Sequence, residues 1–131
     1  MLYDKYNENG INFVSIYIQE AHANDEWPIR TKKELRINQH TNIAEKVKAA
    51  KFMQEYTGWK IPLFVDGIDG DNFENRFHAW PFRVFAMDSK NRLIWMMEPQ
   101  PNDGLFDFKQ IEQQIQLAMT QHQRKDSCII L

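Results

Sequence analysis

Four short runs of apolar, β-branched and aromatic residues predict four β-strands. The first run follows the turn-like segment Asn7-Glu8-Asn9-Gly10 and ends in polar residues. Pro62 cannot donate a ladder hydrogen bond, so it is expected among the first residues of its strand. The last two runs flank Asp88-Ser89-Lys90-Asn91, whose composition favours a tight turn and hence an antiparallel hairpin. The runs are 13–18, 61–65, 82–87 and 92–97.

Two longer segments have the spacing of amphipathic helices. The first begins at Asn42, because Asn42 and Glu45 have the spacing of a capping box, and Gly58 is its expected end. The second runs from near Asp107 to about Gln123. The apolar stripes expected to be buried are Ile43, Val47, Ala50 and Met53 in the first helix, and Phe108, Ile111, Ile115 and Ala118 or Met119 in the second.

The order of these elements predicts an α/β fold with a mixed sheet flanked by helices. A strand-helix-strand crossover implies a parallel pair, and the closing hairpin adds antiparallel strands. Trp80-Pro81 stands just before the hairpin, and aromatic-proline bonds favour the cis isomer, so Pro81 is a candidate structural cis-proline. The combination resembles the C-terminal half of a thioredoxin-like fold. We expect one domain over residues 1–123 and a tail over 124–131.

Composition narrows the class of protein. The chain has 131 residues, of which 43% are hydrophobic and 26% charged, as in average globular domains. Its net charge of -2 argues against a nucleic-acid partner. The longest apolar-rich run, residues 11–18, is too short to cross a bilayer, and the N-terminus lacks a secretory pattern, so a cytoplasmic location is expected. Cys128 is the only cysteine, which excludes an internal disulfide and a Cys-x-x-Cys pair.

The polar segment that follows the first strand carries the candidate chemistry. It begins at the C-terminal end of a strand, where open α/β sheets place their ligands. If the extended path continues, Glu20 and His22 point to the same side. A carboxylate beside an imidazole fixes its tautomer and raises its pKa, as proton delivery near neutral pH requires. The alternative is an ordinary polar loop, because such pairs also occur in structural networks.

This segment closely resembles the signature of the iodothyronine deiodinase family, in which a strand leads into Tyr-Ile-Glu-Glu-Ala-His and then Ser-Asp-Gly-Trp. Here it reads Ile16-Tyr17-Ile18-Gln19-Glu20-Ala21-His22-Ala23-Asn24-Asp25-Glu26-Trp27. His40 with Asn42 is similar to the family's His-Gln-Asn segment. Pro81-Phe82-Arg83-Val84 is similar to its Pro-Glu-Arg. The resemblance covers about residues 10 to 98.

The resemblance implies an oxidoreductase that removes iodine from an aromatic ring such as that of thyroid hormone. In the family a selenolate or thiolate attacks the iodine, and a neighbouring Glu and His deliver a proton to the ring carbon. By motif position Glu20 and His22 are the proton relay, while Tyr17, His40, Arg83 and Trp27 bind the substrate. The family implies an external thiol reductant and no other cofactor. A metal site of His22, His40 and Glu20 is the alternative, but the resemblance explains these residues without metal.

One part of the family pattern has no counterpart in the sequence. The Gly-x-x-x-Thr-(selenocysteine or cysteine)-x-Pro turn that carries the nucleophile belongs one strand earlier. The expected fold is therefore N-terminally truncated, and the chain alone is expected to be inactive. Because selenocysteine is encoded by UGA, one hypothesis is that Met1 starts a gene model downstream of that codon. The alternatives are a non-enzymatic thioredoxin-like binding module and a fragment of a peroxiredoxin-like thiol reductase. The exposed sheet edge predicts association, such as a homodimer.

The C-terminal residues Cys128-Ile129-Ile130-Leu131 match the C-a-a-X pattern for prenylation. Modification of Cys128 would attach the protein reversibly to a membrane surface. The alternative is an apolar tail that packs on the domain.

A second short motif, Asp66-Gly67-Ile68-Asp69-Gly70-Asp71, lacks the glycine and glutamate positions of an EF-hand, so it is interpreted as a turn.

Overall fold

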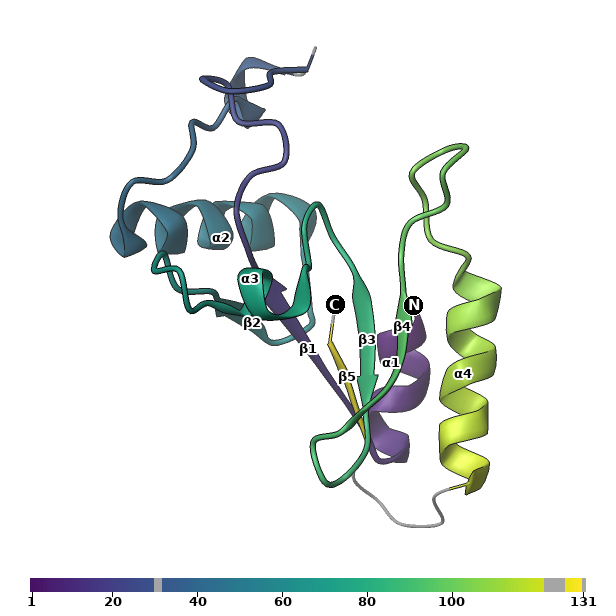
Figure 1. The fold of residues 1–131 in the computed structure, drawn as a ribbon. Coiled ribbons are helices and arrows are strands. Elements are labelled where there is room, and N and C mark those ends of the chain that lie inside the picture. Colours follow the sequence, from purple (N-terminus) through teal and green to yellow (C-terminus); the bar gives the residue numbers. More distant parts are fainter. Residues whose placement is uncertain (30–31, 122–126, 131) are drawn as a thin grey trace. The chain divides into compact units, whose positions relative to one another are not determined.

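The computed structural model describes residues 1–29, 32–121 and 127–130. The chain forms two compact units (Figure 1). One unit consists of residues 1–15 and 82–131, and the other of residues 16–81. Strand β1 (Ile11–Tyr17) passes from the first unit into the second. Each unit is a mixture of helices and strands, and the architecture is the thioredoxin-like α/β fold that the sequence predicts.

The sheet of the first unit has the strand order β1-β5-β3-β4. Strands β3 (Val84–Met87) and β4 (Leu93–Met97) form the predicted antiparallel hairpin. Strand β5 (Ser127–Ile130) lies between β1 and β3, parallel to the former and antiparallel to the latter. All four residues of β5 pair with β1, and Cys128, Ile129 and Ile130 also pair with β3, so the strand is internal to the sheet.

The placement of β5 differs from the expectation of a tail over residues 124–131. Ile129 pairs with Phe13 on one side and Ala86 on the other. A β-branched segment that reaches two unpaired strand edges gains backbone hydrogen bonds on both sides, which a solvated tail lacks. Leu131, the last residue of the prenylation pattern, lies outside the described residues. Prenylation of Cys128 stays a prediction, and its backbone would have to leave β5 to reach a transferase.

Two helices of the first unit are joined by a cluster of polar side chains. Helix α1 (Leu2–Tyr6) is too short for a readable period, but the family resemblance places the end of a helix at residues 3–7. Its Tyr6 hydroxyl donates to the Glu112 carboxylate at 2.7 Å, and Lys5 Nζ donates to the same oxygen at 2.5 Å. Glu112 belongs to α4 (Phe108–Gln121), so these bonds hold α1 against α4.

The buried face of α4 matches the predicted stripe except at its start. Ile111, Ile115 and Ala118 are buried. Phe108, which the stripe also includes, is 64% exposed. Because Phe108 is the first helical residue, its side chain projects beyond the turn that packs on the sheet.

A 3₁₀ turn (Asn7–Asn9) precedes β1 and ends at Gly10, whose φ of 84° suits glycine.

The second unit places β2 (Leu63–Val65) beside β1. The backbone N–H of Asp66 donates to the carbonyl of Tyr17 at 3.0 Å, so the C-terminal ends of both strands meet. The other elements are α2 (Ile43–Thr57), α3 (Phe73–Phe77) and a 3₁₀ turn (Lys33–Leu35). The Trp80–Pro81 bond is cis, the isomer that the sequence favours.

Helix α2 begins and ends where the sequence predicts. The Asn42 side chain accepts a hydrogen bond from Glu45 N at 3.0 Å, and Gly58 closes the helix in the left-handed region with φ 65°. The reciprocal bond is shifted by one residue, because the Glu45 carboxylate accepts from Thr41. The buried face is also rotated from the predicted stripe. It consists of Lys46, Ala49 and Ala50, while Ile43 is 47% exposed.

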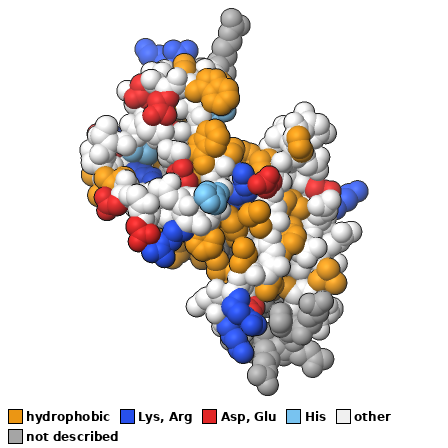
Figure 2. All heavy atoms as spheres, in the orientation of Figure 1, with side chains coloured by type: hydrophobic (Ala, Val, Ile, Leu, Met, Phe, Trp, Pro, Cys, Tyr) orange, Lys and Arg blue, Asp and Glu red, His pale blue; other side chains and the backbone are white. Residues whose placement is uncertain are grey.

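Apolar side chains are also exposed on the first unit. Figure 2 shows hydrophobic side chains gathered over the β3–β4 hairpin. Leu93, Ile94 and Met96 of β4 each expose between 45% and 48% of their surface. None of the helices described here has the length and apolar character needed to cross a membrane.

The hairpin turn is organised by one carboxylate. Asp88 Oδ1 accepts from the backbone N–H groups of Lys90 and Arg92, both at 2.9 Å. Its Oδ2 accepts from the Arg92 guanidinium at 2.7 Å. These donors favour the ionised form and lower the pKa of Asp88 to about 2.

Asp88→Asn should therefore destabilise the protein in a pH-dependent way. A pKa below that of the unfolded chain stabilises the fold fully above the unfolded value, and this contribution is lost as pH falls from about 4 towards 2. The difference in urea midpoint between the parent protein and Asp88→Asn should be large at pH 6 and shrink below pH 4. The exposed Asp69→Asn serves as the control. A difference for Asp88→Asn that is independent of pH would contradict this role.

Ile129→Pro should test the internal position of β5. Proline removes the N–H of a residue that is paired on both sides, and losing such a bond costs about 1–3 kcal/mol. We expect a lower free energy of urea unfolding for Ile129→Pro than for the matched Ile129→Val, which keeps the N–H. Equal stability of the two variants would show that residues 127–130 are not part of the sheet.

Candidate functional site

Two segments of the second unit meet beyond the end of β1. Asn24 N donates to the carbonyl of Ile37 at 2.8 Å, and Gln39 N donates to Asp25 Oδ1 at 2.8 Å. The segment after β1 is thereby joined to residues 36–41, which lead into α2. His40 is in this way brought to the residues of the Glu-Ala-His motif.

A side-chain amide fixes the backbone of Glu20. Gln39 Oε1 accepts from Glu20 N at 3.2 Å, and Gln39 Nε2 donates to the carbonyl of Glu20 at 3.2 Å. The amide thus satisfies both polar groups of one peptide residue, as a neighbouring strand would. Sequence reasoning missed Gln39, and its only available signal is its position next to His40.

Tyr17, Glu20 and His40 form a hydrogen-bonded group. The Tyr17 hydroxyl donates to the Glu20 carboxylate. His40 Nε2 lies 3.4 Å from the same hydroxyl and 3.9 Å from Glu20 Oε1. A hydroxyl that donates to the carboxylate can accept from an Nε2–H of the neutral imidazole. The three groups therefore form a path along which a proton can pass from the imidazole towards the carboxylate.

Burial alters the ionisation of two members of this group. The His40 side chain is only 4% exposed and that of Glu20 is 26% exposed. Burial raises the pKa of Glu20 above its usual range. Burial also lowers the pKa of His40, with a further contribution from the positive charge of Lys46 and an opposing one from Glu45. His40 is therefore neutral at neutral pH, and Glu20 retains a proton more readily than an exposed glutamate.

His22 does not join Glu20, contrary to the expected pairing. The chain turns at Ala21 and His22, so the extended path that would align the two side chains ends there. His22 is exposed, with Nδ1 3.3 Å from the carbonyl of Trp27 and its ring 5.3 Å from the Trp27 ring. Trp27 is 64% exposed, so the two rings form a small open aromatic surface.

Lys46 places a buried positive charge behind His40. Only 3% of Lys46 is exposed, and its ammonium donates to the carbonyl of Gly67 at 3.0 Å. Both Lys46 and His40 line a polar cavity of about 100 Å³. Burial lowers the pKa of Lys46, while Asp66 and Glu74 oppose this effect. The cavity wall thus contains one buried cation, Lys46, bonded to a backbone carbonyl, and one carboxylate, Glu74, which accepts from the Gln19 amide at 2.7 Å.

The aspartate-rich segment after β2 has a structural role. The Asp66 carboxylate accepts from the backbone N–H groups of Gly67, Phe73 and Glu74 at 2.8–3.0 Å. It therefore caps the start of α3, which agrees with the interpretation of a turn. Within the described part of the chain, no group of three His, Cys, Asp or Glu side chains is arranged to hold a metal ion.

Arg83 belongs to the first unit, and its guanidinium is already engaged. Nη2 lies 3.1 Å from Glu98 Oε1, and Nη1 donates to the carbonyl of Phe82 at 3.0 Å. A ligand carboxylate at Arg83 would have to compete with Glu98, whose side chain is 61% exposed. No motif or spacing in the sequence indicates that Glu98 pairs with Arg83.

Comparison with known proteins decides the family. The profile of the iodothyronine deiodinase family matches residues 1–123. The chain belongs to the iodothyronine deiodinase family. A type I iodothyronine deiodinase of Xenopus laevis is 43% identical over 76 residues. This match covers 58% of the chain and only 29% of the relative, so this deiodinase-family chain corresponds to a minor part of the relative's length.

Tyr17→Phe should raise the pKa of Glu20 further in this deiodinase-family chain. A hydroxyl that donates to a carboxylate favours its ionised form, so removing it favours the protonated form. The measurement is a pH titration of the Glu20 carboxyl carbon by NMR, assigned with Glu20→Gln. The control is Tyr56→Phe, which removes an exposed hydroxyl on α2. An unchanged or lower pKa in Tyr17→Phe would contradict the hydrogen-bonded group.

Proposed function

We propose that this chain is a reductive deiodinase-type domain that binds an iodinated aromatic substrate and supplies the proton for its ring carbon. The observation that carries the proposal is the contact of Tyr17, Glu20 and His40 within the family motif. Burial raises the pKa of Glu20, so its carboxyl group keeps a proton at higher pH than an exposed glutamate does and suits the role of proton donor. After each transfer, His40 can take up a proton at Nδ1 while its Nε2 proton passes through the Tyr17 hydroxyl to Glu20, so the imidazole stays neutral.

The reaction requires a nucleophile and a reductant. A selenolate or thiolate attacks the iodine, so a selenium–iodine or sulfur–iodine bond forms and the carbon–iodine bond breaks. The electron pair of the broken bond stays on the ring carbon, which takes up the proton. An external thiol then displaces iodide and forms a selenium–sulfur or sulfur–sulfur bond with the nucleophile. A second thiol breaks this bond, leaves as the disulfide and restores the nucleophile, so the two thiols together supply the two electrons. Cys128 is the only sulfhydryl of the sequence and does not stand in the family's nucleophile motif, so we assign it no part in this step.

The other family positions are assigned to binding. His22 and Trp27 present an exposed aromatic surface to a substrate ring. Because both side chains are exposed, they are better placed to contact a ligand than to act as a proton donor. Arg83 offers a planar cation for a carboxylate or phenolate, in exchange for its pairing with Glu98.

Iodide release with an added nucleophile should test the proposal. The 131-residue chain alone should release no iodide from an iodothyronine in dithiothreitol, because covalent catalysis lacks its nucleophile. With a small aryl selenol added, the chain should accelerate release. Glu20→Gln should reduce this acceleration by about 10²–10⁴-fold, the usual contribution of general acid catalysis, and the exposed Glu55→Gln should not.

Three outcomes would contradict parts of the proposal. Release without selenol that survives Cys128→Ser would mean that another nucleophile exists in the chain. Equal acceleration by the parent protein and Glu20→Gln would place the proton donor elsewhere. Saturable binding of the iodothyronine without any acceleration would favour a non-enzymatic binding module.

A further inference from the structure

Three Asp-Gly steps in the chain can undergo the same spontaneous rearrangement. Glycine has no side chain to shield its backbone nitrogen, so this nitrogen can attack the side-chain carboxyl group of the aspartate before it. The steps are Asp66-Gly67, Asp69-Gly70 and Asp103-Gly104. All three lie in the described part of the chain, so their surroundings can be compared directly.

Hydrogen bonds oppose the rearrangement at Asp66. Its carboxylate accepts from the backbone N–H groups of Gly67, Phe73 and Glu74 at 2.8–3.0 Å. A nitrogen that donates to a carboxylate oxygen lies close to the plane of the carboxylate, whereas attack on Cγ requires an approach from above that plane. Only 6% of Asp66 is exposed, so the water that completes the rearrangement also has little access.

The Asp103 step is exposed, but its reacting groups are held by other partners. Gly104 N donates to the carbonyl of Gln100 at 2.9 Å, and Asp103 Oδ1 accepts from Leu105 N at 2.9 Å. Gln100 N in turn donates to the carbonyl of Leu105 at 2.8 Å, which closes the turn. The nitrogen and the carboxyl carbon can therefore meet only if this turn opens.

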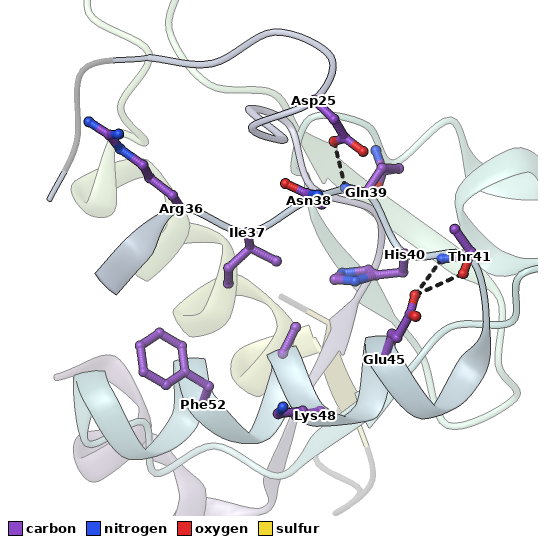
Figure 3. Close-up of a pocket in the computed structure, with 11 residues that line it drawn as sticks. Asp25, Arg36, Ile37, Asn38, Gln39, His40, Thr41, Glu45, Lys48 and Phe52 are labelled. Atoms are coloured by element: carbon purple, nitrogen blue, oxygen red, sulfur yellow. Dashed lines mark hydrogen bonds between the residues drawn. The ribbon is translucent and has the colours of Figure 1, made fainter. Parts of the chain in front are cut away.

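The Asp69 step has no such restraint. Other carboxylates of the second unit accept backbone N–H groups, as Asp25 and Glu45 do (Figure 3). No group that the structure describes donates a hydrogen bond to the Asp69 carboxylate, and none accepts one from the Gly70 N–H. Both residues are exposed, and a Cβ atom added at Gly70 would meet nothing within 4 Å. The two reacting groups can therefore meet, and water reaches both.

The segment around Asp69 is anchored on both sides. The carbonyl of Gly67 accepts from Lys46 Nζ at 3.0 Å and from Asn72 Nδ2 at 3.3 Å. Asn72 Oδ1 accepts from Asn75 N at 2.9 Å and caps the start of α3. A longer main chain between Gly67 and Asn72 would disturb the hydrogen bond of the buried Lys46 or the cap of α3.

We propose that Asp69 is a site of isoaspartate formation in the folded protein. The Gly70 nitrogen attacks Cγ of Asp69, a nitrogen–carbon bond forms, and the carboxyl OH leaves as water with the N–H hydrogen. Water then adds to the main-chain carbonyl carbon of Asp69 and breaks its bond to the Gly70 nitrogen. The product has a free α-carboxylate, and its main chain is longer by one methylene group.

The new α-carboxylate defines the class of enzyme that would act on the product. It is a substrate for a carboxyl methyltransferase that uses S-adenosylmethionine, since such an enzyme esterifies the α-carboxylate of isoaspartate and allows the ring to form again. The rearrangement itself needs only water. It is therefore independent of the deiodination proposed above.

Incubation of the folded chain and of the same chain in urea should test this site. Both samples are kept at mildly acidic pH, and isoaspartate at each Asp-Gly step is quantified by mass spectrometry of the peptides with electron-transfer fragmentation. In urea the three steps should react at similar rates. In the folded chain the rate at Asp69 should stay within about threefold of its rate in urea, whereas Asp66 and Asp103 should be slowed about tenfold or more.

A matched pair of variants identifies the attacking nitrogen. Gly70→Ala places a methyl group beside this nitrogen, in open space and outside the left-handed region, so the variant should fold and should slow the reaction at Asp69 about tenfold. Gly67→Ala, whose added Cβ atom makes only ordinary contacts, should leave the rate at Asp69 unchanged. Deamidation at Asn9-Gly10 is counted separately, because it raises the mass of its peptide and isomerisation of aspartate does not.

Two results would overturn the proposal. One is a folded chain in which Asp69 is slowed as strongly as Asp66 and Asp103. The other is an equal rate at Asp69 in Gly70→Ala and Gly67→Ala. Because no iodide is measured, failure of the iodide assay leaves this result unaffected.

Discussion

The arrangement of the site depends on the hydrogen bonds made by the backbone N–H and C=O groups just beyond the end of β1. Strand β1 ends at Tyr17, yet the N–H and C=O of Glu20 are both bonded, because the Gln39 amide takes the place of a peptide group. This pairing holds the Glu20 carboxylate next to the Tyr17 hydroxyl and the buried His40 ring. The shifted pKa values follow from that placement, since burial is their main cause. An ordinary polar loop would leave all three side chains in water.

Features of the fold that depend on residues close together in the sequence could be predicted. The cap at Asn42 and the turn around Asp88 use hydrogen bonds within four residues, so composition is enough to locate them. Strand β5 could not be located in this way. Its pairing partners lie in β1 and β3, and only the open edges of those strands make a short apolar segment fold into the sheet. The rotation of α2 has a similar origin, because the partners of Lys46 come from the segment after β2.

The sequence could predict which residues belong to the candidate site, but not which of them contact one another. The motif identified Tyr17, Glu20, His22 and His40, and three of them meet. Spacing alone suggested that Glu20 pairs with His22, since it assumed an extended chain beyond the strand. The turn at Ala21 and His22 directs His22 to Trp27 and leaves Glu20 to a histidine from a distant segment. Such a contact depends on two loops joined by their own hydrogen bonds, which no local pattern describes.

The internal position of β5 has a consequence for the way the polypeptide folds. During synthesis β1 is made before β3, and the strand that pairs with both is made only after α4. Until then two strand edges remain without partners, and such edges pair readily with other chains. Contacts between Ile11–Val14 and Ser127–Ile130 also have a large sequence separation, which slows folding. The sheet is therefore completed only when its last-made strand pairs, and until then the facing edges of β1 and β3 are open to other chains.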